Sequence, residues 1–160
     1  MTATEITAPA GVPFIDIRRD VEAPRDLVFR AFTDPALLVQ WLGPRRYVME
    51  IDRYEVRDGG GWRYIHRGAD GAEYGFHGVF HGVPTPDAMV QTFEWEGAPG
   101  HISLDAISLE ERDGRTTIHG HSVYQSVEDR DAMLENGMAQ GVEEGYERLD
   151  ELVGRLTPVA

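Results

Sequence analysis

The architecture follows from one stretch near the C-terminus, NGMAQGVEEGYERLDELVGRL, residues 136–156. Its apolar residues recur at the spacing of a helix, and charged residues fill the positions between them. The apolar stripe consists of Met138, Val142, Leu149, Leu152, Val153 and Leu156. This pattern predicts one long amphipathic helix, which needs a large apolar surface elsewhere in the chain to cover its stripe.

That surface is expected to be a sheet, because the sequence before the helix is rich in strand-forming residues separated by short turn signals. Asp58-Gly59-Gly60-Gly61 and Asp113-Gly114 are two such turns. Strands are predicted over residues 47–57, 62–67, 73–83, 89–96, 102–111 and 116–124. Because the connections are short, successive strands should pair as an antiparallel meander.

One more strand and two short helices come before the meander. Alternating apolar and charged residues over 14–21 predict a strand with one buried face. Pro24 suits the first turn of a helix, and Asp34 followed by Pro35 begins a second short helix. The predicted fold class is therefore α+β, with a seven-stranded curved antiparallel sheet wrapped around the long C-terminal helix and two short helices after the first strand.

The domain organisation is simple. A length of 160 residues suits one domain, which we place at residues 14–157. Residues 1–13 are small, polar and interrupted by proline and glycine, and we expect them to form a flexible tail. This segment has no basic start and no apolar run, so it does not resemble a signal peptide, and we expect a cytoplasmic protein.

The composition excludes several kinds of chemistry. There is no cysteine, which rules out disulfides, thiol nucleophiles and cysteine-built zinc sites. All 15 basic residues are arginine, so Schiff-base and P-loop lysine chemistry are excluded too. The net charge of −13 repels phosphate backbones and anionic lipid, so we expect no nucleic acid and no membrane among the partners.

Three groups of residues have the character of family motifs. They are VEAP at 21–24 with FTDP at 32–35, VRDGGGWRY at 56–64, and GM at 137–138 with YERLDEL at 146–152. In order and spacing they resemble the START-like (SRPBCC) superfamily, and within it the activator of Hsp90 ATPase homologue 1-like family. The resemblance implies the helix-grip fold of Bet v1 and START proteins, with a cavity between the sheet and the long helix. It also implies a range of roles, from lipid carriers and aromatic cyclases to hydrolase-like enzymes and chaperone activators.

Large rings gather on two of the predicted strands. Trp62, Tyr64 and His66 alternate onto one face of their strand, and Phe93 and Trp95 do the same on a later strand. If these rings face the helix, they form the floor of a pocket that suits a flat or aromatic ligand. The alternative is a filled core made of the same residues.

The helix opposite contains two glycines, each of which costs about 1 kcal/mol relative to alanine. Gly141 and Gly145 lie among Met138, Val142 and Tyr146, and we expect all five to face the pocket. The glycines serve either to leave space for a ligand or to let the helix pack closely on the sheet.

A metal site or a nucleophile is not expected. His119 and His121 lie about 6.6 Å apart on one strand face, whereas His77 and His81 are about 13 Å apart. The pattern of the strand suggests that Ile118, Gly120 and Ser122 face inward. His119 and His121, which alternate with them, should therefore face solvent. No serine lies in a Gly-x-Ser-x-Gly elbow, so we assign no catalytic residue, no metal ligand and no cofactor.

The leading functional hypothesis is a domain that binds a small hydrophobic or aromatic molecule. One alternative is an enzyme of cyclase, dehydratase or hydrolase type that uses a pocket histidine or tyrosine as acid or base. Another is a module that interacts with a chaperone, as the Hsp90-activator resemblance implies. A homodimer is compatible with each of these hypotheses.

Overall fold

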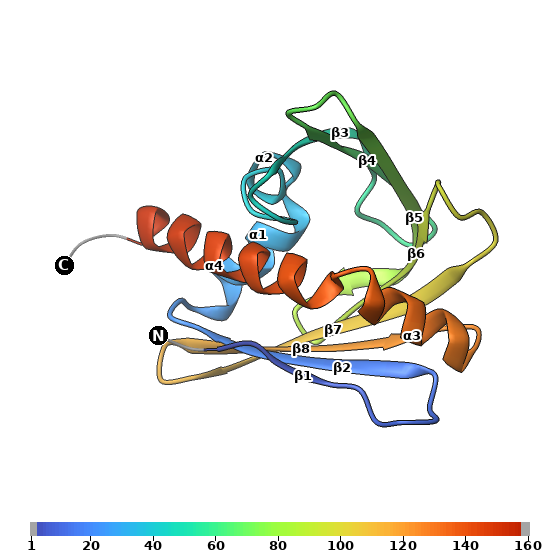
Figure 1. Ribbon diagram of the computed structural model, residues 1–160. Helices are drawn as coiled ribbons and strands as arrows, with labels where there is room; N and C mark the ends of the chain where they lie inside the picture. The colour runs from blue at the N-terminus through green and yellow to red at the C-terminus, as the bar shows by residue number, and fades with distance from the viewer. Residues whose placement is uncertain (1–2, 158–160) are drawn as a thin grey trace.

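Helix α4 (Met138–Leu156) lies across the concave face of a curved antiparallel sheet (Figure 1). The structure, a computed structural model, describes residues 3–157. The sheet has the strand order β1-β2-β8-β7-β6-β5-β4-β3. The strands are β1 (Glu5–Thr7), β2 (Phe14–Val21), β3 (Tyr47–Tyr54), β4 (Gly61–Gly68), β5 (Glu73–Thr85), β6 (Ala88–Trp95), β7 (Ile102–Arg112) and β8 (Arg115–Val123). All neighbouring strands are antiparallel, and the predicted α+β helix-grip fold is confirmed.

The described residues form eight strands, one more than predicted. The additional strand, β1, lies in the segment that we expected to be a flexible tail, and that expectation is wrong for Glu5–Thr7. Three residues are too few to show a strand pattern in the sequence, but they pair with Asp16, Ile17 and Arg18 and so cover part of the free backbone edge of β2. The Thr4 backbone N–H also donates to Glu143 of α4, with a distance of 3.1 Å. Met1 and Thr2, which belonged to the same predicted tail, lie outside the described residues.

The two short helices after β2 begin where the sequence predicts them. Helices α1 (Arg25–Thr33) and α2 (Pro35–Leu38) follow β2, and the Asp34 side chain accepts a hydrogen bond from the Ala36 backbone N–H. Helix α3 (Val127–Glu135) precedes α4, and Gly137 separates them with a φ of 81°. Because that left-handed conformation interrupts the helix, α4 begins at Met138 rather than at Asn136.

Two buried side chains, Trp41 and Arg19, hold α4 in place. Trp41, which is 1% exposed, stacks on Tyr146 of α4 and donates its indole N–H to the Ala31 carbonyl. Arg19 of β2, also 1% exposed, forms ion pairs with Glu143 at 2.9 Å and Asp150 at 2.5 Å.

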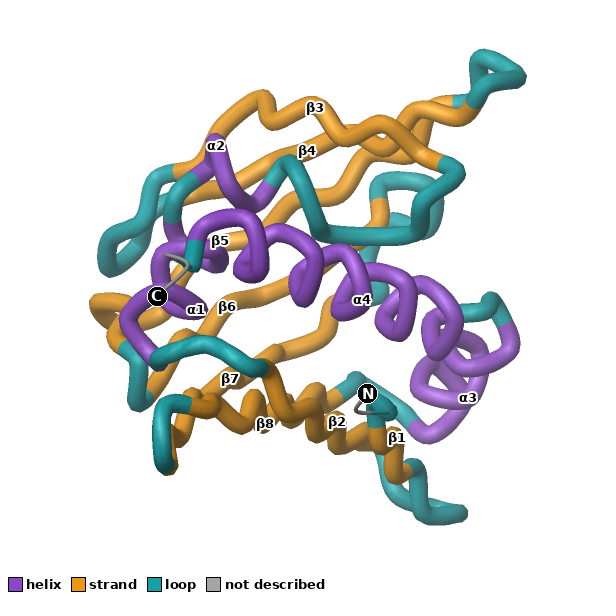
Figure 2. The backbone as a smooth tube through the Cα atoms, turned by 90° about the vertical axis from the view of Figure 1, so that its left-hand side faces the viewer, coloured by secondary structure: helices purple, strands orange, loops and turns teal. Residues whose placement is uncertain are grey.

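Burial along α4 is uneven. Gly145, Tyr146, Leu149, Leu152 and Val153 are buried, whereas every residue from Met138 to Glu144 retains accessible surface. Figure 2 shows α4 running along the inner side of the sheet, with α3 at one end and α1 near the other. The second half of α4 is therefore anchored, and its first half lies over the space where the predicted pocket residues meet.

Along the described chain, residues 3–157, we find no helix with the length and hydropathy needed to span a bilayer.

Candidate functional site

A cavity of about 520 Å³ separates the first half of α4 from the sheet. The strands contribute Tyr64, His66, Phe93 and Trp95 to its lining. The helix contributes Met138, Gly141, Val142, Gly145 and Tyr146. Trp62, the remaining residue of the predicted set, lines an adjoining hollow of about 270 Å³. The two hollows share Tyr64, Phe93 and Val142 among their lining residues, so they are neighbouring parts of one interior space.

Strand β4 supplies a row of stacked rings because its side chains alternate between the two faces of the sheet. The ring of Tyr64 lies 5.1 Å from that of Trp62 and 5.2 Å from that of His66, centroid to centroid. On the outer face, Arg63 donates to Glu96 at 2.8 Å. The alternation read from the sequence therefore places the aromatic side chains inside and the arginine outside.

Strand β6 places its two predicted rings differently. Phe93 lies 6.0 Å from Trp62 and 5.4 Å from Phe76 of β5, so it continues the aromatic floor of the cavity. Trp95 is 37% exposed and lies at the rim, where it also lines a small side hollow next to α3. Phe76 was missed in the sequence because β5 has several glycines and histidines that obscure its alternation.

The two helical glycines have different roles. A Cβ atom on Gly145 would lie 3.2 Å from the Gly43 backbone nitrogen and 3.4 Å from the Trp41 carbonyl oxygen, so Gly145 permits close backbone packing. A Cβ on Gly141 would meet only the Pro44 side chain, at 3.7 Å. Both alternatives considered for the glycines are therefore present, because Gly145 provides contact and Gly141 provides space.

The outer end of the cavity has residues that the sequence did not reveal. The guanidinium of Arg46 lies 4.7 Å above the Tyr47 ring, and that ring is 5.4 Å from Tyr74. All three line the cavity, and Arg46 is exposed to solvent. They come from a loop and from strand ends, where no periodic pattern indicates which way a side chain points.

His66 is packed tightly at the side of the cavity. Its side chain is 7% exposed, and its Nε2 atom is buried with no hydrogen-bond partner. Gly43 has a φ of 92°, and a Cβ there would lie 2.4 Å from the His66 ring. Burial lowers the pKa of His66 to about 4, and the positive charge of Arg148 adds to the shift. His66 is therefore neutral at pH 7.

The inner hollow, the one of about 270 Å³ that Trp62 lines, contains a carboxyl group that the sequence analysis did not single out. Asp105 of β7 lines this hollow, and the Ser103 hydroxyl donates to its Oδ1 at 3.1 Å. Burial raises the pKa of Asp105 to about 6, although hydrogen bonds from Ser122 and Ser103 favour its charged form. The sequence does contain an indication that Asp105 is buried, because Asp105 shares its strand face with Ile107 and Leu109, both of which point inward.

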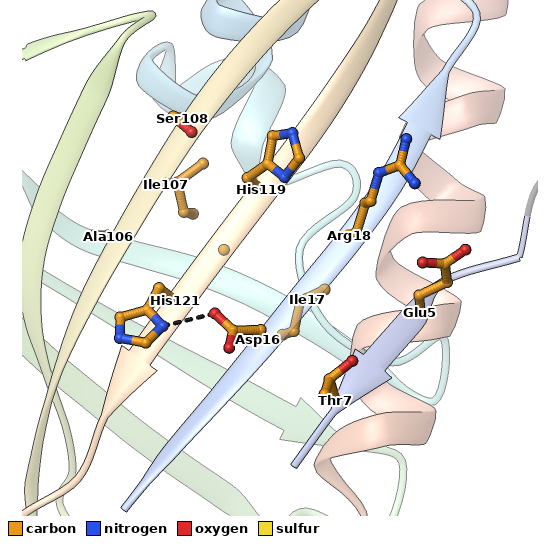
Figure 3. A pocket seen from close by; sticks show the side chains of 11 residues that line it. Glu5, Thr7, Asp16, Ile17, Arg18, Ala106, Ile107, Ser108, His119 and His121 are labelled. Atoms are coloured by element: carbon orange, nitrogen blue, oxygen red, sulfur yellow. Dashed lines mark hydrogen bonds and ion pairs between the residues drawn. The ribbon is translucent and has the colours of Figure 1, made fainter. Parts of the chain in front are cut away.

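The outer face of the sheet has a shallow groove of about 440 Å³, shown in Figure 3. His119 and His121 line it with side chains 43% and 47% exposed, so the prediction that both face solvent is confirmed. His121 lies 2.6 Å from Asp16 (Figure 3), and His119 lies 3.6 Å from Glu110. Within residues 3–157, these and the other histidines and carboxylates form no group of three that could hold a metal ion.

The fold and the cavity define a helix-grip protein, in which a curved sheet and a C-terminal helix enclose an interior space. More narrowly, the family model described as "Activator of Hsp90 ATPase homolog 1-like protein" matches residues 22–154, and the chain belongs to that family. No curated protein matches the chain.

Solved structures of bacterial proteins are similar along almost the whole chain. A protein of Rhodobacter sphaeroides has 27% identity and a TM-score of 0.87, over 96% of this chain and 99% of its own. A protein of Arthrobacter aurescens has 24% identity and a TM-score of 0.86, over 94% and 91% respectively. A third, from Mycobacterium smegmatis, has 21% identity and a TM-score of 0.85, over 99% of each chain. The latter two support the fold alone.

Proposed function

We propose that this protein binds a small aromatic or otherwise apolar molecule in the cavity between α4 and the sheet. The observation that carries the proposal is the cavity of about 520 Å³ with its floor of stacked rings. This volume lies within the range of about 300–1,000 Å³ that is typical of small-molecule sites. Flat ligands suit such a floor, because aromatic rings stack face to face with an offset.

The residues proposed to contact the ligand are those placed around this space. Tyr64, Phe93 and Trp62 would lie below it, while Met138, Val142 and Tyr146 would cover it from above. The cavity also distinguishes this proposal from a protein-interaction module, which needs an exposed apolar surface rather than an interior space.

The enzymatic alternative, in which a pocket histidine or tyrosine acts as acid or base, has less support. A histidine with a pKa of about 4 is a neutral imidazole and a weak base at pH 7, and burial raises the pKa of Tyr64 well above its usual range. A general acid or base works best when its pKa lies near the working pH. The pocket histidine and tyrosine are therefore better suited to shaping the site than to transferring protons.

A titration with the neutral fluorescent probe N-phenyl-1-naphthylamine tests the proposal. The wild-type protein should bind the probe and increase its fluorescence. Gly141→Leu should abolish this binding, because the new side chain would enter the cavity where only Pro44 now lies within 4 Å. Gly154→Leu is the matched control, since Gly154 is on the same helix with no atom within 4 Å of its Cβ position.

Circular dichroism should show that both variants remain folded. If the wild-type protein binds no probe, or if a folded Gly141→Leu variant binds it unchanged, the cavity is not the binding site and the proposal fails.

A further inference from the structure

The inner end of the interior space is polar, in contrast to the rest of its lining. Asp105 of β7 is directly opposite Gln91 of β6 on one side and Ser122 of β8 on the other. Three adjacent strands thus place a row of polar side chains on the inner face of the sheet. All three residues line the inner hollow, together with Ser103 and Tyr124.

The carboxyl group of Asp105 has hydrogen-bond donors around it but no cation. Among the residues that the structure places around this hollow, none is an arginine. The remaining titratable groups there are the phenols of Tyr54, Tyr64, Tyr124 and Tyr146, and His121, which pairs with Asp16 on the outer face. Arg130, near Tyr124, is already engaged by Asp131 and by backbone carbonyls. A carboxylate in such surroundings lacks the opposite charge that usually accompanies a buried ion.

The walls around this carboxyl group are aromatic. Trp62, Tyr64, Phe93 and Tyr124 line the same hollow, and the first two are stacked with their planes 19° apart. The face of an aromatic ring attracts a cation through its quadrupole, most strongly where water is excluded. A carboxylate surrounded by aromatic rings therefore favours the binding of a positively charged group.

We propose that the ligand is an aromatic amine whose ammonium group pairs with Asp105 in the inner hollow while its rings occupy the larger apolar hollow. This inference rests on the proposed function and specifies its ligand class. A ligand with a carboxylate or phosphate at the buried end is excluded by repulsion from Asp105 and by the net charge of −13. A purely apolar ligand leaves the carboxylate desolvated without compensation.

Two probes of nearly equal shape test the proposal, namely 1-naphthylmethylamine, a cation at pH 7.5, and the neutral 1-naphthylmethanol. Calorimetric titration of the wild-type protein should show the amine binding about tenfold tighter or more, as for a charge-assisted hydrogen bond. In Asp105→Asn this preference should disappear while the alcohol still binds. Glu110→Gln is the matched control, because Glu110 is on the same strand with a side chain 73% exposed, and it should keep the preference.

The wild-type protein provides a second measurement that needs no variant. Below pH 6 the affinity for the amine should fall as Asp105 takes up a proton, whereas the affinity for the alcohol should stay constant. Equal affinities for the two probes at pH 7.5, or a preference that survives Asp105→Asn, would overturn the proposed ligand class and leave the proposed function intact. If neither naphthyl probe nor N-phenyl-1-naphthylamine binds, the proposed function fails and this inference fails with it.

Discussion

The indole ring of Trp41 stacks on the phenol ring of Tyr146, with centroids 5.9 Å apart and planes 19° from parallel. The same indole donates a hydrogen bond of 2.9 Å to the carbonyl of Ala31, in the last turn of α1. Carbonyls in a last turn have no partner within their own helix. Trp41 therefore completes the end of α1 and supports α4 at the point where the helix becomes buried.

Trp41→Phe should lower the free energy of unfolding by about 2–3 kcal/mol, because it removes the buried donor and part of the ring contact. Urea denaturation followed by circular dichroism measures the effect. Trp95→Phe serves as the control, since Trp95 is 37% exposed at the rim of the cavity. A loss no greater for Trp41→Phe than for Trp95→Phe would contradict the anchoring role of Trp41.

The glycines of α4 should respond to alanine in opposite directions. Gly145→Ala should lower the free energy of unfolding by about 1–2 kcal/mol, because its Cβ would press on the Gly43 backbone at 3.2 Å. Gly154→Ala should raise it by about 0.5–1 kcal/mol, because alanine favours a helix and space is free there. Thermal unfolding of the two variants side by side distinguishes these outcomes, and equal shifts would argue against close packing at Gly145.

His66 should make the fold less stable in mild acid. Its pKa is about 4 in the folded protein and near 6.5 when exposed, so only the unfolded chain binds the proton between these values. The free energy of unfolding should therefore fall by about 2 kcal/mol from this group alone between pH 7 and pH 5.

The measurement compares urea unfolding of the wild-type protein with that of His66→Met at both pH values. The variant should lose less stability on acidification, and His119→Gln, on the outer face, should behave as the wild-type protein does. Parallel losses in the wild-type protein and His66→Met would show that the imidazole is not buried in its neutral form.

Asp105 should act in the opposite sense. Its pKa rises from 3.8 to about 6 on folding, so the folded protein must hold an unfavourable charge above pH 6 and is relieved of it as the pH falls. Asp105→Asn should therefore raise the free energy of unfolding by about 1–3 kcal/mol at pH 7.5. This advantage should shrink at pH 5, where wild-type Asp105 is largely protonated.

Urea unfolding at the two pH values, with Glu110→Gln as the surface control, measures this advantage. A destabilising effect of Asp105→Asn at pH 7.5 would show that the carboxylate is structurally satisfied. A stabilising effect would show that the fold retains this group at a cost in stability, as is common for residues that serve binding.

The sequence predicted most of the fold because the relevant patterns are local. The alternation of Trp62, Tyr64 and His66 determined which side chains point inward, and the stripe from Met138 to Leu156 predicted the long helix. Strand β1 was missed because three residues cannot display a period of two. Its pairing depends on the unpaired edge of β2, which is a tertiary property.

The candidate site was predictable only in part. The rings of β4 and β6 were found, since they are large and alternate regularly. Asp105 was missed, because an acidic residue is normally exposed and only its inward-facing neighbours Ile107 and Leu109 indicate otherwise. The separate roles of Gly141 and Gly145 depend on the distance to the Gly43 loop, which no local pattern encodes.

The short strand β1 also bears on how copies of this protein meet in solution. A long free strand edge is a template for another chain, and edge-to-edge pairing of this kind leads to aggregation. Here Glu5–Thr7 covers part of β2 and itself offers only three residues for further pairing. At the opposite edge, an irregularity between Ile51 and Arg53 interrupts the pairing of β3 with β4. Both edge strands of the sheet are therefore poor templates for pairing with another chain. Removing the first seven residues would leave the whole length of β2 as an unpaired edge open to such pairing.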